Sequence, residues 1–293
     1  MNIPLTEQPN PRTTSLDSLS ARQLSGVFNA EDFNAARAVK KARPQIASVI
    51  LLAAKTYANR HKIIFIGAGT SGRLGILEAA ECVPTFGVKP SQIIGLIAGG
   101  KKAVFRAQEG AEDDAKQGAK DIAQKAKKGD LVIGLAASGN TPYVQGALKQ
   151  ARTLGATTVL ISCNPKADTR YADIHVYLPT GPEALTGSTR LKAANATKMA
   201  LNAITTGAMA LCGKTYGNLM VDVQPTNKKL VARALRLIGQ LCPTDEKTAR
   251  KLLASSGNNV KTAVVMYRKK CNRSKAQQLL KKSSGRLAEA LDE

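Results

Sequence analysis

The sequence is poor in aromatic and acidic residues. It has no tryptophan, and aromatic side chains make up 4% of the chain. The hydrophobic fraction is 43%, so a core has to be aliphatic, as in a parallel sheet covered by helices. Lys and Arg number 43 against 21 Asp and Glu, a formal net charge of +22. This charge favours anionic ligands, but its basic stretches lack interleaved aromatics for stacking on bases, so no nucleic-acid partner is expected.

Signatures of membrane, secreted and metal-binding proteins are also missing. No apolar run approaches the roughly 18 residues that span a bilayer, and the polar N-terminus lacks a signal-peptide core. The 5 cysteines include no C-x-x-C pair, which indicates reduced thiols rather than a disulfide framework or a zinc site. The 2 histidines are too isolated for metal ligation. We therefore expect a soluble, cytoplasmic protein with no metal and no membrane partner.

Short β-rich apolar runs alternate with helix-length segments in the middle of the chain. The runs are Lys62–Gly67, Gln92–Ile97, Leu131–Leu135, Thr157–Ser162 and Ile174–Leu178. The helical segments between them include Arg73–Cys82, Ala103–Lys127 and Pro142–Leu154. This alternation predicts the α/β class, as a three-layer, doubly wound, five-stranded parallel sheet. Ligands of such sheets bind at the carboxyl ends of the strands, so loops 67–72, 98–101 and 136–142 are expected around one pocket.

Helical patterns lie on both sides of the predicted sheet in the sequence. Residues 21–58 have helical periodicity, with Pro44 in a first turn, and Leu191–Cys212 predicts a long alanine-rich helix. Short helices follow, with starts marked by Pro243-Thr-Asp245 and Asn272-Arg-Ser274. We expect three regions. They are an N-terminal arm with helices (1–54), the sheet domain (55–218) and a C-terminal helical region (219–293) with a bundle at about 243–293.

The glycine-rich turn Gly67-Ala-Gly-Thr-Ser-Gly72 directly follows a predicted strand. Its G-x-G-x-x-G pattern matches the dinucleotide fingerprint, but that fingerprint needs an acidic residue at the end of the next strand, and Leu96–Gly100 has none. No nicotinamide cofactor is therefore expected. Thr70 and Ser71 place two hydroxyls beside the free N–H groups of a helix start. With Gly69 they favour a phosphate cradle over a turn that needs glycine only for its backbone.

A second polar turn, Ala137–Pro142, follows the third predicted strand. It offers the backbone of Gly139 and the side chains of Ser138, Asn140 and Thr141. Ordinary helix caps would explain one such turn. Two in the same sheet favour a phosphorylated ligand held by hydroxyls and backbone amides.

Hydroxyls and cations also gather in Thr186–Lys192, at the start of the predicted long helix. Ser188, Thr189 and Lys192 are candidate ligand contacts. A plain N-cap explains Ser188 or Thr189 equally well.

Six carboxylates are candidates for acid–base chemistry. Glu78 and Glu81 stand three residues apart on one predicted helix and so share a face. The other four cluster in a second segment expected to be helical, and they are Glu109, Glu112, Asp113 and Asp114. Carboxylates across a pocket can act as acid and base if burial separates their pKa values, but any one of them can equally lie on a solvated helix face. The sequence pattern alone does not show which of the six carboxylates take part in chemistry.

Several segments together resemble a known family. They are Thr6–Thr14, Ile66–Leu74, Glu81–Gly87, Glu109–Asp113, Ser188–Lys192 and Tyr216–Asn227. In this order they resemble the N-acetylmuramic acid 6-phosphate etherases, which are built on a sugar isomerase (SIS) domain and are related to the glucokinase regulatory protein. The resemblance covers nearly the whole chain. The regulatory protein is longer and has two such domains, so a chain with one favours the enzyme.

The resemblance implies a reaction without metal or cofactor. The D-lactyl ether of N-acetylmuramic acid 6-phosphate is cleaved by elimination and then hydration, which gives N-acetylglucosamine 6-phosphate and D-lactate. The family motifs assign Glu81 as the acid at the ether oxygen and Glu112 as the base at C2. One departure is that Val83-Pro84 stands where the family usually has Pro-Pro, which loosens the turn near Glu81.

The resemblance also implies binding residues and partners. Sugar-phosphate contacts are expected at Gly69, Thr70, Ser71, Ser138, Gly139, Thr141, Ser188, Thr189 and Lys192. A homodimer with the site near the interface and a UBA-like C-terminal bundle are expected as well. The main alternative is a non-catalytic sugar-phosphate-binding regulator of the same fold, which needs no pair of glutamates. A sugar-phosphate isomerase would not need the Glu81 segment.

Overall fold

The computed structural model describes residues 3–292, which form two compact units. The sheet unit comprises the residues up to Ala80 together with Pro90–Thr205. The helical unit comprises Glu81–Lys89 together with the residues from Thr206 onward. The division into three regions at residues 54 and 218 stays a prediction.

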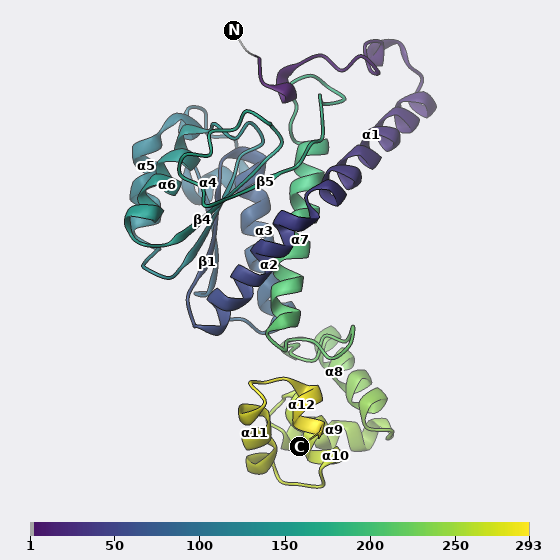
Figure 1. Cartoon of the computed structure of the whole chain (residues 1–293). Helices are drawn as coiled ribbons and strands as arrows, with labels where there is room; N and C mark the ends of the chain where they lie inside the picture. The colour runs from purple at the N-terminus through teal and green to yellow at the C-terminus, as the bar shows by residue number, and fades with distance from the viewer. Residues whose placement is uncertain (1–2, 293) are drawn as a thin grey trace. The chain divides into compact units, whose positions relative to one another are not determined.

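Five parallel strands form the centre of the sheet unit (Figure 1). They are β1 (Ile63–Gly67), β2 (Ile93–Ile97), β3 (Leu131–Leu135), β4 (Thr157–Ser162) and β5 (Ile174–Tyr177). The strand order is β2-β1-β3-β4-β5, and each neighbouring pair is parallel. This order confirms the predicted doubly wound α/β sheet. The order reverses between β1 and β3, where such sheets bind their ligands.

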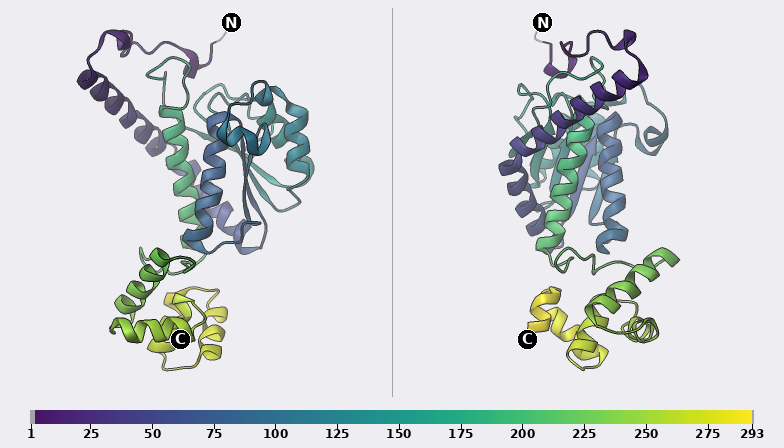
Figure 2. Two further views of the ribbon diagram at one scale, coloured as in Figure 1. Left: turned by 180° about the vertical axis from the view of Figure 1, so that it is seen from behind. Right: turned by 90° about the vertical axis from the view of Figure 1, so that its right-hand side faces the viewer.

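Helices cover both faces of this sheet. The helices up to residue 211 are, in chain order, α1 (Ala21–Lys41), α2 (Arg43–Ala58), α3 (Gly69–Phe86), α4 (Gly100–Phe105), α5 (Ala115–Ala123), α6 (Pro142–Thr153) and α7 (Lys192–Leu211). Short 3-10 helices lie at Leu5–Glu7, Leu16–Ser18 and Ala111–Asp113. Helices α2, α3 and α7 lie on one face and α5 and α6 on the other (Figures 1 and 2). Pro44 lies in the first turn of α2, as predicted.

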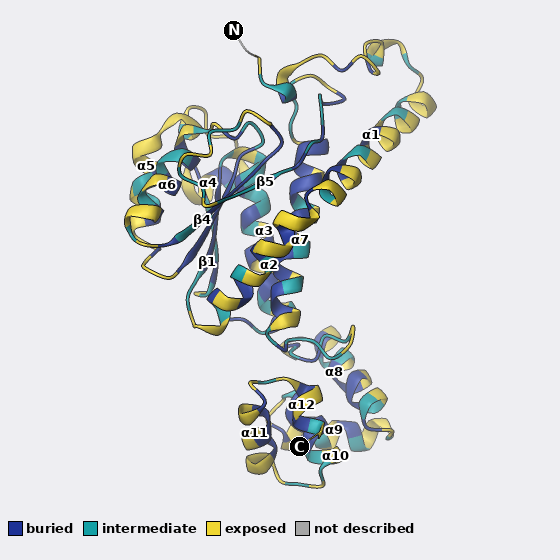
Figure 3. Cartoon of the chain, in the orientation of Figure 1, coloured by how far each residue is buried: buried dark blue, intermediate teal, exposed yellow. Residues whose placement is uncertain are grey.

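The buried residues between the sheet and α5–α6, dark blue in Figure 3, are aliphatic as the composition predicts, except for Tyr143. Ile64, Ile66 and Val132 are fully buried against α6 side chains such as Val144 and Leu148. All residues of β1 and β3 are buried, because helices cover both of their faces.

The segment Ala103–Lys127 is not one helix, so this expectation was wrong. Helix α4 ends at Phe105 and α5 begins only at Ala115. Gly110 between them has φ of +73°, a conformation that helices exclude, and the Asp114 side chain caps α5 by accepting a hydrogen bond from Gln117 N–H. The acidic cluster therefore lies mostly on a connection rather than on a helix face.

Five helices build the main part of the helical unit. They are α8 (Lys228–Leu241), α9 (Glu246–Ser255), α10 (Val260–Arg268), α11 (Arg273–Lys282) and α12 (Leu287–Asp292). The side chains of Asn227, Asp245, Asn259 and Asn272 cap the first four, each accepting a backbone N–H three residues on. The predicted starts at Asp245 and Asn272 are thus confirmed. Lys261 is buried here, with Nζ 2.6 Å from Asp222 Oδ2.

Candidate active site

The polar turns after β1 and β3 lie at the same edge of the sheet, because all strands are parallel. Gly67 pairs in register with Leu135, so the two turns begin at the same level on either side of the point where the strand order reverses. The sheet therefore brings together the two loops expected to hold a phosphate.

Close backbone packing explains the glycines of the first turn. A Cβ on Gly72 would lie 2.5 Å from Ile97 Cγ1, and a Cβ on Gly67 would lie 2.8 Å from Gly72 N. Gly69 has φ of +51° with open space around it. The turn thus needs glycine for its backbone and also leaves space in front of the start of α3, where the first N–H groups lack intrahelical acceptors.

The second turn is held by side chains from outside the predicted motifs. Asn164 Nδ2 donates to the Ser138 carbonyl at 3.0 Å, and Gln145 Nε2 donates to the Gly139 carbonyl at 2.7 Å. Asn140 Oδ1 accepts the Asp168 N–H at 2.9 Å, so this side chain supports the loop. Thr141 precedes α6, but its hydroxyl makes no capping hydrogen bond. Helix capping therefore does not account for Thr141, and its hydroxyl is available to a ligand.

A pocket of about 160 Å³ opens beside the first turn. It is lined by Ala68, Gly69, Arg73, Ala98, Ala103 and the segment 107–112. Five alanines form apolar walls, and among these lining residues the charged side chains are Arg73, Glu109 and Glu112. This pocket combines a helix N-terminus, a guanidinium and two carboxylates in a space suited to part of a small anionic molecule.

The glutamates of α3 have different surroundings. Glu78 is buried, and its carboxylate accepts hydrogen bonds from Lys198 Nζ at 2.7 Å and from the Thr205 hydroxyl at 2.6 Å. It therefore ties α3 to α7 and is not available for chemistry. Glu81, one turn further along, is exposed. Glu112 is exposed too and lines the pocket.

The segment before α7 is organised by buried charges. Lys192 is buried, and its ammonium donates to Glu31 and to the Pro182 carbonyl. Glu183 caps α7, since its carboxylate accepts the N–H groups of Lys192 and Ala193 at 3.0 and 2.9 Å. Burial raises the pKa of Glu183, against these two hydrogen bonds.

This arrangement bears on three predicted ligand contacts. Ser188 and Thr189 are not the cap of α7, which begins at Lys192 and is capped by Glu183. Their side chains are half-buried. The ammonium of Lys192 is committed to protein groups, so its contribution to a site is to hold the loop in place.

Four residues of the site were not predicted from the sequence. They are Arg73, Gln145, Asn164 and Glu183. Arg73 stands in a segment that carries the family resemblance, but motif reading alone does not show that it faces a pocket. Gln145 and Asn164 lie on separate elements and meet the second turn only through the fold. No local pattern in the sequence marks such long-range partners.

The two histidines have structural surroundings. His175 Nε2 lies 2.8 Å from Ser162 Oγ, and burial lowers the pKa of the imidazole. His61 Nδ1 lies 3.6 Å from Asp130 Oδ1. No group of three or more metal-binding side chains occurs within residues 3–292. Over the same range, no helix is both long and apolar enough to cross a bilayer.

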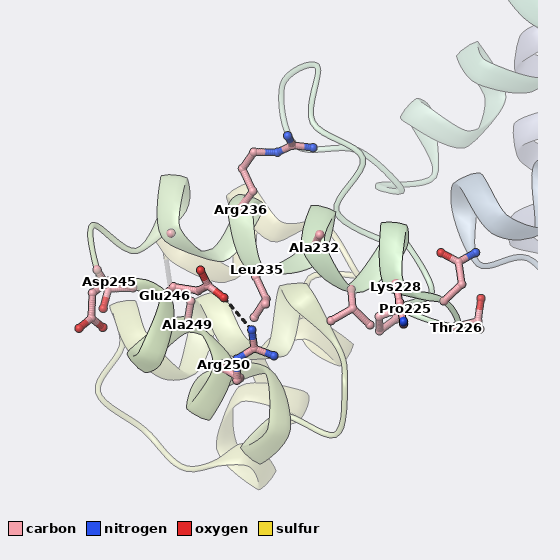
Figure 4. A pocket seen from close by; sticks show the side chains of 14 residues that line it. Pro225, Thr226, Lys228, Ala232, Leu235, Arg236, Asp245, Glu246, Ala249 and Arg250 are labelled. Atoms are coloured by element: carbon pink, nitrogen blue, oxygen red, sulfur yellow. Dashed lines mark hydrogen bonds and ion pairs between the residues drawn. The ribbon is translucent and has the colours of Figure 1, made fainter.

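A larger pocket of about 800 Å³ lies in the helical unit (Figure 4). It is formed by α8, α9 and the segment before α8. Figure 4 shows Glu246 paired with Arg250 at its rim. None of the residues predicted to bind substrate lines this pocket.

Comparisons with known proteins agree with this fold. The sequence matches the family model of the glucokinase regulatory protein N-terminal SIS domain over residues 45–152, and that of the SIS domain over residues 111–207. Among solved structures, an E. coli CFT073 protein determined as a complex gives a TM-score of 0.50 at 16% identity. This similarity covers 68% of the chain and 97% of that protein, and it supports the fold alone.

Curated relatives match over nearly their whole length. An N-acetylmuramic acid 6-phosphate etherase of Exiguobacterium sp. is 48% identical over 288 residues, which is 98% of either chain. The N-acetylmuramic acid 6-phosphate etherase 2 of Vibrio cholerae is 46% identical, covering 99% of this chain and 95% of its own. The corresponding etherase of Lactobacillus gasseri is 47% identical, covering 98% and 97%.

Proposed function

The chain belongs to the N-acetylmuramic acid 6-phosphate etherase family, and we propose that it cleaves the D-lactyl ether of N-acetylmuramic acid 6-phosphate. The products are N-acetylglucosamine 6-phosphate and D-lactate, as in the recycling of cell-wall amino sugars. The observation that carries this proposal is the 48% identity over 98% of both chains to a relative of that name. The family's two glutamate motifs are also both present, as Glu81 and Glu112.

The reaction is a carbon–oxygen lyase step followed by hydration. Glu112 takes the proton from C2 while the bond between C3 and the ether oxygen breaks, and Glu81 gives its proton to the departing lactate oxygen. Water then adds across the C2–C3 double bond and restores the 3-hydroxyl. The Glu112 carboxylate lines the sheet-unit pocket, and such a side chain contributes about 10²- to 10⁴-fold to the rate.

The phosphate is assigned to the two turns after β1 and β3. Gly69, Thr70 and Ser71 supply N–H and hydroxyl groups at the start of an 18-residue helix. Ser138 and Thr141 supply hydroxyl groups in the second turn, and Gly139, with φ of +76°, gives the turn its backbone conformation. Ser188 and Thr189 extend this polar set, and Lys192 positions their loop. No cofactor takes part in the proposed reaction.

A homodimer is part of the proposal. Large apolar side chains are exposed on four helices of the sheet unit, and they are Phe28, Phe33, Leu51, Leu77 and Met199. Packing against a second copy would remove the apolar surface of these side chains from water. We expect the active site to lie near the interface between the two copies.

Two further expectations belong to the proposal. We place the protein in the cytoplasm, where thiols stay reduced. The helices after residue 243 form a small bundle for which a UBA-like fold is expected.

Release of D-lactate tests the proposed function. The purified chain is incubated with N-acetylmuramic acid 6-phosphate beside Glu112→Gln and Glu81→Gln variants. Wild type is expected to release D-lactate, and each variant to be slower by at least about 100-fold. Deuterium exchange from solvent into C2 assigns the roles, since it should be lost in Glu112→Gln and kept in Glu81→Gln. The opposite pattern reverses the roles, and binding without lactate release supports the regulator.

A further inference from the structure

Arg73 supplies the cation of the sheet-unit pocket. It lies in the second turn of α3 and is half-buried, and its side chain lines the pocket together with Glu109 and Glu112. The remaining described lining residues are alanines, glycines and Gln108. One positive side chain therefore shares a small space with two negative ones and with apolar walls.

The guanidinium is fixed at one end and open at the other. Arg73 Nε donates to the Val104 carbonyl at 2.9 Å, which holds the side chain against α4. Within residues 3–292, neither terminal amino group of Arg73 donates to a protein acceptor, and the glutamates of the pocket form no ion pair with it. The two amino groups thus remain as a planar fork, which suits a carboxylate bound through both oxygens.

The substrate of the proposed reaction carries two anions at opposite ends of the sugar. The phosphate is on C6, whereas the lactyl carboxylate hangs from the oxygen on C3, next to the C2 proton that Glu112 is proposed to remove. A cation in the same pocket as Glu112 therefore lies beside the lactyl group.

We propose that Arg73 binds the carboxylate of the lactyl group and thereby selects lactyl ethers over sugar phosphates that lack this group. The assignment rests on the proposed function, because it uses the position of Glu112 at C2. It gives the etherase a contact that holds the leaving group while the C3–oxygen bond breaks. Binding of N-acetylglucosamine 6-phosphate, which has no carboxylate, does not use this contact.

Arg73→Gln is the discriminating variant. The Gln Nε2 atom is as many bonds from Cα as the Arg Nε atom, so it can still donate to the Val104 carbonyl. The two terminal amino groups are removed. Arg73→Lys is the second variant, because it keeps the charge and loses the planar fork. Circular dichroism of each full chain checks that the fold is retained.

Calorimetric binding of two ligands tests the proposal. N-Acetylmuramic acid 6-phosphate is titrated into a Glu112→Gln background, which slows turnover, and N-acetylglucosamine 6-phosphate is titrated in parallel. Arg73→Gln is expected to weaken binding of the muramic ligand about 10- to 100-fold and that of the glucosamine ligand less than about 2-fold. Arg73→Lys is expected to fall in between for the muramic ligand.

Three results would overturn the assignment. Equal weakening of both ligands would mean that Arg73 holds the phosphate or only the fold, and unchanged binding of both would mean that it touches neither. Failure of wild type to bind the muramic ligand would also overturn it. If wild type binds this ligand but releases no D-lactate, the proposed function fails. The same pair of titrations, made on the Arg73 variants without the Glu112 change, then still decides whether the carboxylate is recognised.

Discussion

Replacing Glu31 by glutamine should destabilise the sheet unit strongly. Glu31 lies on α1, is 3% exposed, and accepts hydrogen bonds from Arg12 Nε at 2.7 Å, Asn10 Nδ2 at 3.0 Å and the buried Lys192 ammonium. These contacts join the N-terminal arm, α1 and the start of α7. Glutamine keeps the shape of the side chain but removes its charge, so Lys192 remains buried without a counter-ion.

The magnitude follows from the pKa of Glu31. Burial alone would raise this pKa, but hydrogen bonds and charge from Arg12 and Lys192 outweigh burial and lower it from 4.5 to about 2. A shift of this size corresponds to about 3 kcal/mol at neutral pH. The loss is comparable to the ~3–5 kcal/mol seen when one partner of a buried ion pair is removed. We expect Glu31→Gln to lower the free energy of unfolding by about 3 kcal/mol at pH 7.

The pH dependence gives a second, independent signature. Because the folded-state pKa is lowered, the stabilisation by Glu31 is complete above the unfolded pKa of about 4.5 and is lost as the pH falls toward 2. The difference between wild type and Glu31→Gln should therefore shrink by about 2 kcal/mol between pH 7 and pH 3.

Urea unfolding followed by circular dichroism measures both effects, since the chain has no tryptophan for fluorescence. Glu7→Gln is the matched control, because Glu7 is exposed on the same N-terminal arm. It should change stability by no more than about 0.5 kcal/mol. A Glu31→Gln protein within about 1 kcal/mol of wild type, or a difference that stays constant from pH 7 to pH 3, would refute the reasoning.

Two further predictions concern packing within each unit. Gly146→Ala should lower the stability of the sheet unit by about 2 kcal/mol, because the new Cβ would lie 2.0 Å from a carbonyl oxygen of α5. Its control, Gly26→Ala in an open part of α1, should raise the stability by up to about 1 kcal/mol. Asp222→Asn should lower the stability of the helical unit by about 3 kcal/mol, because Lys261 stays buried without the Asp222 carboxylate as its partner. Its control, Glu289→Gln at an exposed ion pair, should have little effect on stability. Urea unfolding distinguishes each variant from its control, and equal stabilities within either pair would contradict the prediction.

The sequence predicted the sheet because strand formation has a strong local signal. Short apolar runs rich in β-branched residues mark β1 to β5 to within a residue or two, and their alternation with helices implies parallel order. The error at Ala103–Lys127 concerns a segment of helix length that holds a connection, because α4 ends at Phe105 and the positive φ of Gly110 keeps α5 from starting before Ala115. Local composition did not show that break.

The candidate site divides in the same way between sequence and structure. The turns after β1 and β3 were visible in the sequence, because glycines and hydroxyl residues cluster directly after two predicted strands of the same sheet. The sequence did not show which of the candidate carboxylates is available for chemistry. Glu78 and Glu81 look alike on one helix, yet one is buried against Lys198 and the other is exposed.

The sequence by itself thus determined the fold class, the two polar turns and the family, since these depend on local patterns and on motif order. Only the tertiary structure decided which charges are buried in pairs and which line a pocket. Lys192 meets Glu31 across 161 positions of sequence, and Arg73 meets Val104 through the packing of α3 on α4. Burial and partnership set the protonation and availability of a charged group, and both depend on residues that are distant in the sequence.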